Sequence, residues 1–269
     1  MKLILIFVFI VLFICILLPN TTTSRKLLRE QLKWVEIKQY GKKFDMAIHE
    51  KDGVSDWIQD RKKVYCEDNI LNQILQSSDP DSVFLDIGSN IGSCALLAAA
   101  LGFKSYAFEP NPINFKLLEA SIKKNHFESL ITLIKCGASN VNEEFDLFYL
   151  PDNKGHGMIN SFEPRLASQY IKTKGCVKTV DSVVPESVNV NVIKIDTEGH
   201  EEHVIKGMSN LLLNKNRRPY YINYEVNPEA LAAQKSSSKR IRELIQKMKY
   251  NLNPSRKTGL RNEEAVISR

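Results

Sequence analysis

The sequence predicts an α/β fold with a doubly wound, mostly parallel sheet. Short apolar runs bounded by turn residues alternate with segments of helical spacing, as in chains whose parallel strands are joined by crossover helices. Three such runs are Val83–Leu85, Tyr106–Phe108 and Val192–Ile195, and each is followed directly by an acidic residue. The composition, with 43% hydrophobic and 25% charged residues, is that of a globular chain and excludes disorder throughout.

The chain begins with an apolar segment that predicts a hydrophobic helix. Leu3–Leu18 contains no charged residue and ends at Pro19. It is shorter than the ~20 residues that span a typical bilayer, but longer than the apolar core of most signal peptides. We therefore expect residues 1–19 to form an uncleaved single-pass membrane anchor in the secretory pathway, in the endoplasmic reticulum or the Golgi. The alternative is a signal segment, with the protein secreted after cleavage.

Basic residues beside this segment bear on its orientation. Arg25, Lys26 and Arg29 follow the segment, whereas Lys2 is the basic side chain before it. The positive-inside rule therefore favours a domain on the cytosolic side of the membrane.

Residues 20–80 form a linker and an N-terminal cap region without a clear motif. We expect a helix at Lys26–Ile37 and a short strand at Phe44–His49. Ile70–Leu75 has helical spacing, and the turn residues that begin at Asp79 end that helix.

The five cysteines give no metal-binding pattern. No C-x-x-C pair is present, so zinc binding is not supported. Cys94 and Cys136 lie in apolar contexts, where we expect each to be a small buried hydrophobic side chain.

The elements after residue 81 are assigned from spacing and caps. Ser93–Leu101 is a helix rich in alanine and leucine, and Asn111 followed by Pro112 marks the start of another helix. The other expected elements are a strand at Leu130–Ile134, an inserted or edge strand at Phe145–Leu150, a flexible loop at Asp152–Ser161, a helix through Val204–Leu212, a strand at Tyr220–Tyr224 and a basic helix at Lys239–Lys249.

Residues 231–269 form a basic C-terminal region, which we expect to consist of a helix and a polar tail. Lys235–Arg269 contains ten Lys or Arg residues against three Glu. Aromatic residues are not interleaved with the basic ones, and no nucleic-acid-binding motif is present. DNA and RNA are therefore excluded as main partners.

The loop after the strand at Val83–Leu85 reads D-x-G-x-N-x-G, from Asp86 to Gly92. Dinucleotide-binding loops read G-x-G-x-x-G and receive a pyrophosphate at the start of the following helix. An acidic residue at the start of the turn would repel a pyrophosphate, but it suits the ammonium group of S-adenosylmethionine. Gly88 and Gly92 permit a sharp turn, and Asn90 stands where a second glycine would be expected.

A second carboxylate supports a nucleoside ligand. Glu109 ends the next strand, twenty-one residues after Gly88, and its two oxygens match the two hydroxyls of a ribose. Ligands of open parallel sheets bind beyond the carboxyl ends of the strands, so both carboxylates are expected at one edge. We therefore expect Asp86, Gly88, Asn90, Gly92 and Glu109 to bind S-adenosylmethionine.

Three sequence blocks resemble the FkbM family of methyltransferases: Val83–Gly92, Phe108–Asn111 and Ile193–Glu201. The third block is the most specific, because the first two occur in many class I methyltransferases. The resemblance covers about residues 83–226. It implies a Rossmann-like class I methyltransferase fold over residues 81–230, S-adenosylmethionine as cofactor, and usually an oxygen acceptor on a sugar, glycan or other small hydroxylated metabolite.

Methylation of an alcohol needs alignment of the acceptor oxygen and removal of its proton. Asp196, at a strand end, is the expected base or orienting group, and Glu198 is expected to share that work. The alternative role for both is to stabilise the start of the helix near Gly199. Secondary candidates are His156, His200 and Glu225. No metal-ligand spacing is present, so we assign no metal ligands; metal dependence stays open, because several carboxylates converge at this edge.

Two other functions remain open from the sequence. A nicotinamide-dependent oxidoreductase would use the same fold, although Asp86 and Asn90 argue against a dinucleotide. A membrane-anchored binding module without turnover would keep the same cofactor-binding residues.

Overall fold

The computed structural model describes residues 32–77, 81–150, 153–159, 169–253 and 260–267. The chain divides into Met1–Lys33 and Trp34–Arg269, and the fold below is that of the second unit. The hydrophobic helix and membrane anchor expected at residues 1–19 lie outside the described residues. Within the described part of the chain, no helix has the length and apolar character needed to cross a membrane.

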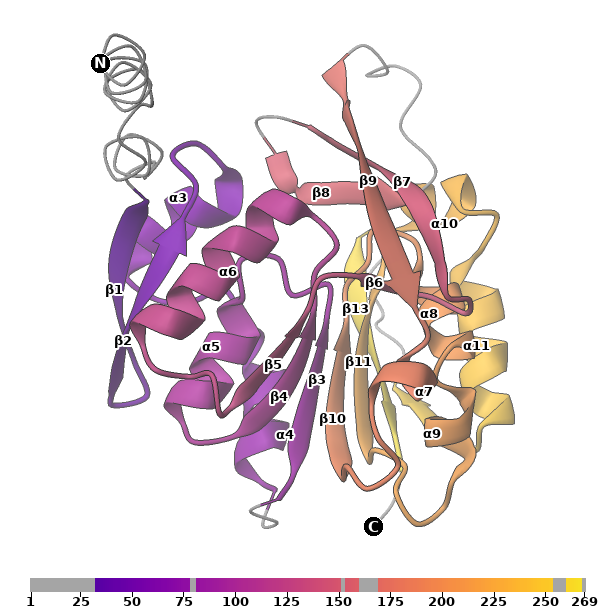
Figure 1. Ribbon diagram of the computed structural model, residues 1–269. Helices are drawn as coiled ribbons and strands as arrows, with labels where there is room; N and C mark the ends of the chain where they lie inside the picture. Colours follow the sequence, from indigo (N-terminus) through magenta and orange to yellow (C-terminus); the bar gives the residue numbers. More distant parts are fainter. Residues whose placement is uncertain (1–31, 78–80, 151–152, 160–168, 254–259, 268–269) are drawn as a thin grey trace, which may run out of the picture. The chain divides into compact units, whose positions relative to one another are not determined.

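A seven-stranded sheet forms the centre of this unit, in the order β12-β13-β11-β10-β3-β4-β5 (Figure 1). Its strands are β3 (Val83–Ile87), β4 (Lys104–Phe108), β5 (Ile131–Ile134), β10 (Val190–Ile195), β11 (Tyr221–Val226), β12 (Asn251–Asn253) and β13 (Arg261–Val266). Neighbouring strands from β11 to β5 are parallel, whereas β13 is antiparallel to both β11 and β12. The predicted α/β fold with a mostly parallel sheet is confirmed, and the sheet is mixed.

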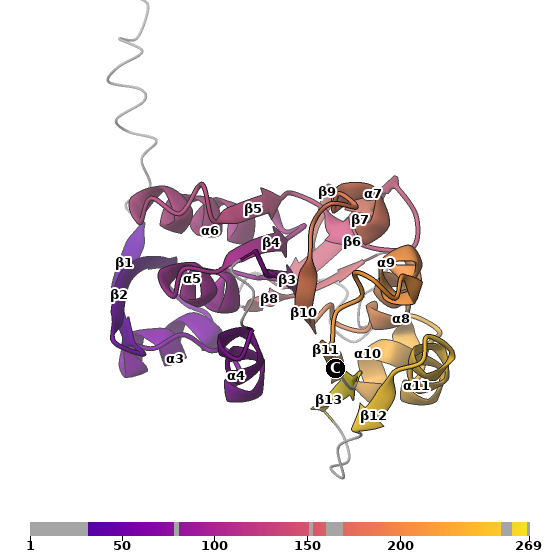
Figure 2. The ribbon, with the colours of Figure 1, turned by 90° about the horizontal axis from the view of Figure 1, so that it is seen from below.

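Helices cover both faces of the sheet (Figure 2). One side carries α4 (Asp68–Leu75), α5 (Ser93–Ala100) and α6 (Pro112–Lys124), and the other carries α7 (Val180–Val183), α8 (Glu201–Lys206), α9 (Ser209–Leu213) and α11 (Ser238–Lys247). Ile70, Phe84 and Ala98 belong to the apolar core of the first side. Ile193 and Ile245 belong to that of the second. Two further helices are α3 (Gly53–Arg61) and α10 (Pro228–Ala233).

The caps predicted from sequence are present, and one predicted helix is divided. The side chain of Asn111 accepts a hydrogen bond from the Ile113 amide at 3.0 Å, and Pro112 begins α6. The helix expected through Val204–Leu212 is split into α8 and α9 around Gly207. A Cβ at Gly207 would lie 1.8 Å from the Ser139 carbonyl oxygen. The backbones at Gly207 and Ser139 are therefore so close that only glycine fits at position 207.

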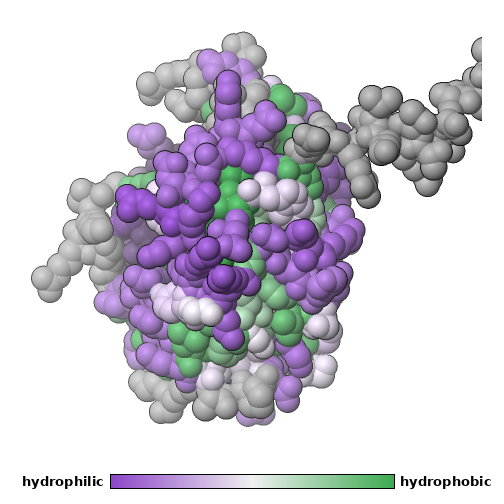
Figure 3. Space-filling model, turned by 90° about the vertical axis from the view of Figure 1, so that its left-hand side faces the viewer, coloured by the Kyte–Doolittle hydropathy of each residue, from purple (hydrophilic) through white to green (hydrophobic). Residues whose placement is uncertain are grey.

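The region before the sheet forms a hairpin of β1 (Lys33–Gln39) and β2 (Lys42–Ile48). The strand expected at Phe44–His49 is confirmed, but the helix expected at Lys26–Ile37 is wrong where the structure describes it. Val35 and Ile37 are buried and their neighbours in β1 are not, which is the two-residue period of a strand. The surface on this side is mainly hydrophilic, with smaller apolar patches (Figure 3).

Side chains of α6 hold this hairpin in place. The Ser121 hydroxyl accepts a hydrogen bond from the Ala47 amide at 2.9 Å. Asn125 accepts from the Asp45 amide at 2.8 Å and donates to the Asp45 carbonyl at 2.6 Å. The exposed edge of β2 is therefore hydrogen-bonded to helix side chains where a neighbouring strand would otherwise pair.

A second sheet is inserted between β5 and β10, in the order β6-β9-β7-β8. Its strands are β6 (Gly137–Ala138), β7 (Glu143–Leu150), β8 (Asn153–Ile159) and β9 (Ile171–Lys178). The inserted strand expected at Phe145–Leu150 is confirmed as β7, which lies inside this sheet and not at its edge. The flexible loop expected at Asp152–Ser161 is wrong over 153–159, where the backbone pairs with β7 despite its glycines.

The C-terminal tail contains strands that the sequence analysis did not expect. β13 pairs with β11 along its full length, and it buries Glu263 and Ala265. Arg242 and Arg261 form ion pairs with Glu263, the second at 2.9 Å. A strand with a buried, paired carboxylate has no apolar run, so the hydrophobic pattern does not reveal it.

Two disulfides join outlying segments to the central unit. Cys66 is bonded to Cys94 of α5, and Cys136, just after β5, is bonded to Cys176 of β9. The expectation that Cys94 and Cys136 are merely small buried hydrophobic residues is therefore wrong. Their partners lie 28 and 40 residues away, and only the tertiary fold brings each pair together.

Candidate active site

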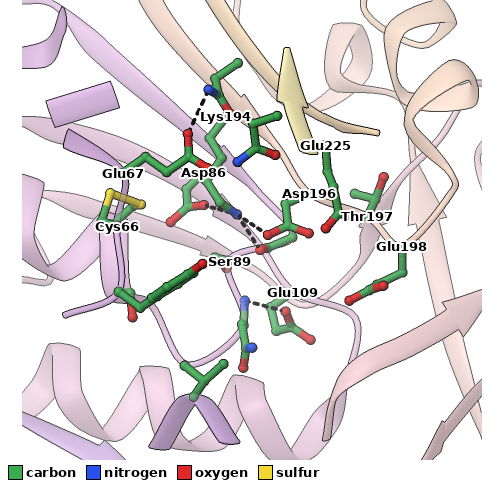
Figure 4. Close-up of a pocket in the computed structure, with 18 of the residues that line it drawn as sticks. Cys66, Glu67, Asp86, Ser89, Glu109, Lys194, Asp196, Thr197, Glu198 and Glu225 are labelled. Atoms are coloured by element: carbon green, nitrogen blue, oxygen red, sulfur yellow. Dashed lines mark hydrogen bonds and ion pairs between the residues drawn. A yellow bond between two sulfur atoms is a disulfide. The ribbon is translucent and has the colours of Figure 1, made fainter. Parts of the chain in front are cut away.

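A cavity of about 420 Å³ lies beyond the carboxyl ends of β3, β4, β10 and β11 (Figure 4). The acidic residues that line it are Glu67, Asp86, Glu109, Asp196, Glu198 and Glu225, and the basic ones are Lys194 and Arg261. Asp86 and Glu109, which we expected at one ligand site, face the same cavity. Of the five predicted cofactor-binding residues and the two main catalytic candidates, Asp196 and Glu198, only Gly92 is absent from its lining.

The glycine loop is packed tightly against the rest of the site. Gly88 has φ of +76°, and a Cβ there would lie 1.7 Å from the carbonyl oxygen of Asp196. Gly92 has φ of +93°, and a Cβ there would lie 2.2 Å from a methyl carbon of Leu118. Both positions therefore require glycine. Asn90 also has positive φ, at 53°, a conformation that asparagine tolerates better than most residues.

The Glu109 carboxylate holds the loop from β4. One oxygen accepts a hydrogen bond from the Asn90 amide at 2.7 Å, and the other accepts from the Asn111 amide at 2.8 Å. Burial raises the pKa of Glu109 to about 7, although these amides favour the charged form. The Asn114 side chain is a third hydrogen-bond donor to Glu109, which leaves about one acceptor site on the carboxylate. The side-chain oxygen of Asn90 is buried and has no hydrogen-bond partner among the described residues.

Glu109 is also connected to the N-terminal hairpin. The Asn114 side chain forms a hydrogen bond with Glu109, and its oxygen lies 2.8 Å from Nε2 of His49, directly after β2. His49 and Asn114 are both buried. The N-terminal cap region thus contributes to the position of a residue predicted to bind the ribose.

Lys194 of β10 is a central residue of the site that the sequence analysis missed. Its ammonium lies 3.4 Å from Asp86 and 3.4 Å from Asp196, and it donates to the Gly88 carbonyl at 3.0 Å. Burial alone would lower the pKa of Lys194, but the charges of Asp196 and Asp86 raise it above its usual value. The available signal was a lysine inside the apolar run Val192–Ile195.

Asp86 is therefore held by the protein itself. Its side chain is 1% exposed, and its second oxygen accepts a hydrogen bond from the Ala95 amide at 3.1 Å. Burial raises the pKa of Asp86, against the opposing effects of Lys194 and the Ala95 amide. A cationic ligand that reaches Asp86 must share it with Lys194.

Polar side chains continue across the sheet in register with this pair. Lys194 lies opposite Asp86 on one side and Asn223 on the other, and Asn223 lies opposite Glu264. Asn223 donates a hydrogen bond to Glu67, just before α4, at 3.0 Å. Burial raises the pKa of Glu67. Glu67 and Asn223 also line the cavity, and the sequence analysis singled out neither.

Among the predicted catalytic residues, Asp196 is well exposed, with 43% of its side chain accessible. Glu225, at the end of β11, differs from it: burial, followed by the charges of Asp196 and Glu198, raises the pKa of Glu225 to about 9. The raised pKa favours the protonated form of Glu225, which makes it a weaker candidate for accepting a proton. Glu198 has positive φ, at 53°, and lines the cavity beside Asp196.

The start of α8 is organised by Glu201. Its carboxylate accepts hydrogen bonds from the amides of Thr197 and Gly199, at 2.9 and 3.2 Å. Burial raises the pKa of Glu201 to about 7. Glu201 thus stabilises the start of this helix, which was the alternative role considered for Asp196 and Glu198.

The candidate histidines do not add to the site. His200 is buried, lies 2.9 Å from the Ser139 hydroxyl and stacks on His203 at 4.4 Å, outside the cavity lining. Burial, then His203, lowers the pKa of His200 to about 4. The side chain of His156 lies outside the described residues. Among the residues that the structure describes, no group of three or more His, Cys, Asp or Glu is arranged to hold a metal ion.

Comparison with known proteins bears directly on this cavity. Residues 86–252 match the model of the family described as "Methyltransferase FkbM domain". The chain is also 29% identical over 173 residues to the hexuronic acid methyltransferase AglP of Haloferax volcanii, covering 64% of this chain and 69% of that protein.

Solved methyltransferases are similar at a lower level. The methyltransferase FkbM of Methylobacillus flagellatus is 18% identical with a TM-score of 0.44, over 70% of this chain and 44% of that chain. The chain thus spans less than half of that protein. The magnesium protoporphyrin IX methyltransferase of Synechocystis, solved with bound S-adenosylmethionine, is 13% identical with a TM-score of 0.43, over 75% of this chain and 77% of that one.

Proposed function

The chain belongs to the FkbM methyltransferase family and is an S-adenosylmethionine-dependent methyltransferase, and we propose that it methylates a hydroxyl of a sugar or glycan. The observation that carries the proposal is the single cavity in which the glycine loop, Glu109 and Asp196 meet. The similarity to AglP, a hexuronic acid methyltransferase, supports a sugar as acceptor. A nicotinamide cofactor is not expected at such an acidic rim.

The residues present fit the cofactor. We assign one ribose hydroxyl to Glu109, whose carboxylate holds two backbone amides and the Asn114 side chain and keeps one acceptor site. The unpartnered oxygen of Asn90 offers a further acceptor at the same place. Asp86 acts mainly as a positioning residue, because it fixes both the start of α5 and Lys194. The acidic lining favours a cationic sulfonium over a phosphate.

When bound, S-adenosylmethionine supplies an activated methyl group, so the protein's task is to align the acceptor hydroxyl and take its proton. Asp196 is suited to this, because it lies at the centre of the cavity edge, is partly exposed and contacts Lys194 at 3.4 Å. We propose that Asp196 accepts the proton from the acceptor hydroxyl and that Glu198 helps to orient that hydroxyl.

The test compares cofactor binding with turnover in the full chain. S-adenosylhomocysteine affinity is measured by calorimetry, and methyl transfer is measured with labelled donor and fractionated glycan, lipid and metabolite pools. Asp196→Asn should retain affinity within about 3-fold and lose about 100-fold or more of turnover, the usual contribution of a positioned base. Asp56→Asn, an exposed residue of α3, is the matched control and should change neither. Full turnover in Asp196→Asn would refute the assignment, and tight NAD binding would refute the proposed cofactor site.

We also propose that the domain works on the lumenal side of a secretory membrane, held there by residues 1–19. Disulfides persist in oxidising compartments and are rare in the cytosol, so Cys66–Cys94 and Cys136–Cys176 support a lumenal site. This outweighs the weak charge asymmetry around the apolar segment, which favoured the cytosol. Alkylation of the protein from cells before and after reduction tests the proposal, because four additional modified thiols should appear only after reduction. Free thiols at all four positions would contradict it.

A further inference from the structure

We propose that the side of the cavity formed by Tyr65, Cys66 and Glu67 binds the ring of an uncharged sugar, with Tyr65 as the stacking surface. This inference rests on the proposed function, because it specifies the acceptor of the same site. The residues that support it lie in the cap segment before α4 and at the start of β13. None of them is among the cofactor-binding residues assigned above.

The order of the strands separates two ends of the cavity. Glu109 follows β4, Asp196 follows β10, and Arg261 begins β13. Arg261 pairs in register with Val226, so it lies beside the end of β11. A nucleoside held by Glu109 therefore occupies the β3–β4 end, and Asp196 lies between it and the β11–β13 end. An acceptor that Asp196 deprotonates therefore occupies lining that Glu109 does not reach. The cap segment belongs to this lining, and its Glu67 is hydrogen-bonded to Asn223 of β11.

The cap segment adds an aromatic surface to the cavity lining. Tyr65 lines the cavity, yet 62% of it is exposed. Its ring is held edge-to-face by Trp57, with the ring centroids 5.5 Å apart and an interplanar angle of 84°. The next residue, Cys66, is fixed to α5 by its disulfide. An exposed aromatic ring with a constrained backbone and a supporting tryptophan suits contact with the C–H face of a sugar ring.

Polar groups suited to hydroxyls lie directly beside this surface. Glu67 and Asn223 are hydrogen-bonded to each other at 3.0 Å and both line the cavity. Cys66 and Glu67 lie on one side of the cavity, and Thr197 and Glu225 lie on the other (Figure 4). An aromatic surface combined with carboxylate and amide groups matches the alternating apolar and hydroxylated faces of a sugar.

The charges of the lining favour an uncharged sugar over an acidic one. Both cationic residues of the described lining are already engaged with carboxylates: Lys194 with Asp86 and Asp196, and Arg261 with Glu263 at 2.9 Å. A carboxylated sugar would add a negative charge beside further acidic groups, and no lining cation within the described ranges is left to pair with it. The preferred acceptor therefore differs in charge from the hexuronic acid in the name of the relative AglP.

The two tryptophans of the chain allow a direct binding assay. Trp34→Phe leaves Trp57, which contacts Tyr65, as the single tryptophan reporter. The full-length variant is saturated with S-adenosylhomocysteine and titrated with methyl β-D-glucoside, methyl β-D-galactoside, methyl α-D-mannoside and methyl β-D-glucuronide. At least one neutral glycoside should give a saturable fluorescence change, with an affinity about 10-fold or more above that for the glucuronide.

Variants at the stacking position complete the test. In the same background, Tyr65→Ala should weaken binding of the neutral glycoside by about 10-fold and leave the affinity for S-adenosylhomocysteine unchanged, whereas Tyr65→Phe should bind like the parent. Tyr40→Ala, an exposed tyrosine outside the cavity lining, is the matched control. Saturation by none of the neutral glycosides, tighter binding of the glucuronide, or an unchanged affinity in Tyr65→Ala would overturn the inference. Glycoside binding without any methyl transfer would instead refute the proposed function and leave this site standing.

Discussion

Replacing Lys194 by methionine should destabilise the protein strongly, because it leaves a buried carboxylate without its cation. Asp86 is 1% exposed, and Lys194 lies 3.4 Å from it. Removing one partner of a buried ion pair costs about 3–5 kcal/mol. Asp196, with 43% of its side chain exposed, is solvated and adds little to this cost. Since 1 kcal/mol shifts the melting temperature of a domain of this size by about 2–4 °C, Lys194→Met should lower it by roughly 6–20 °C.

Thermal and urea unfolding, followed by circular dichroism with the disulfides intact, measure this effect. Lys104→Met is the matched control, because Lys104 also lies 3.4 Å from a carboxylate, that of Asp81, but both side chains are exposed. The control should cost at most about 1 kcal/mol. Adding Asp86→Asn to Lys194→Met should cost less than the sum of the single changes, because the unpaired charge is then gone.

The pH dependence provides a second check on the same reasoning. Burial raises the pKa of Asp86, so losing Lys194 should raise that pKa further. A protonated Asp86 carries no charge, and the stability difference between wild type and Lys194→Met should therefore shrink as the pH falls through the raised pKa. Equal losses for Lys194→Met and Lys104→Met, or a difference independent of pH, would refute the argument.

Three further predictions concern cofactor binding at Glu109, the role of His49 and the Cys66–Cys94 disulfide. The affinity for S-adenosylhomocysteine should increase as the pH rises through about 7, because Glu109, whose pKa is about 7, must be a carboxylate to accept a ribose hydroxyl in addition to its protein donors. Calorimetry of Glu109→Gln should show weaker binding and a flat pH profile. His49→Ala should reduce the preference for S-adenosylhomocysteine over its 2′-deoxy analogue, measured as a ratio of dissociation constants, and His49→Gln should restore it; an unchanged ratio would mean that His49 does not position Glu109 through Asn114. The double variant Cys66→Ser, Cys94→Ser should lower the free energy of unfolding by about 2–4 kcal/mol. A loss below about 1 kcal/mol would show that this disulfide contributes little to the stability of the fold.

The central strands and the glycine loop were predictable from sequence because their signals are local. An apolar run, an acidic residue and a glycine loop lie within a few residues of one another at Val83–Gly92, and the capping pair Asn111 and Pro112 marks α6 equally locally. The acidic strand ends Asp86, Glu109 and Asp196 were correctly expected at one edge, since parallel strands place their carboxyl ends together.

The missed features depend on contacts between distant segments. The disulfide partners are 28 and 40 residues apart, and nothing local distinguishes a buried free cysteine from a bonded one. β13 carries a buried glutamate that two arginines neutralise, so it lacks the apolar pattern of a strand. Glu67 enters the site only because the segment before α4 reaches Asn223 on β11.

The row formed by Asp86, Lys194, Asn223 and Glu264 also constrains how the sheet can assemble. These residues face one another on four adjacent strands. Sliding β10 by one position would set Ile193 or Ile195 against Asp86 and turn Lys194 toward the opposite, apolar layer. A misaligned pairing of the central strands would therefore bury the charge of Lys194 among apolar side chains. Three of these four side chains, those of Asp86, Lys194 and Asn223, also line the cavity, so part of the site disfavours incorrect strand pairing as the chain folds.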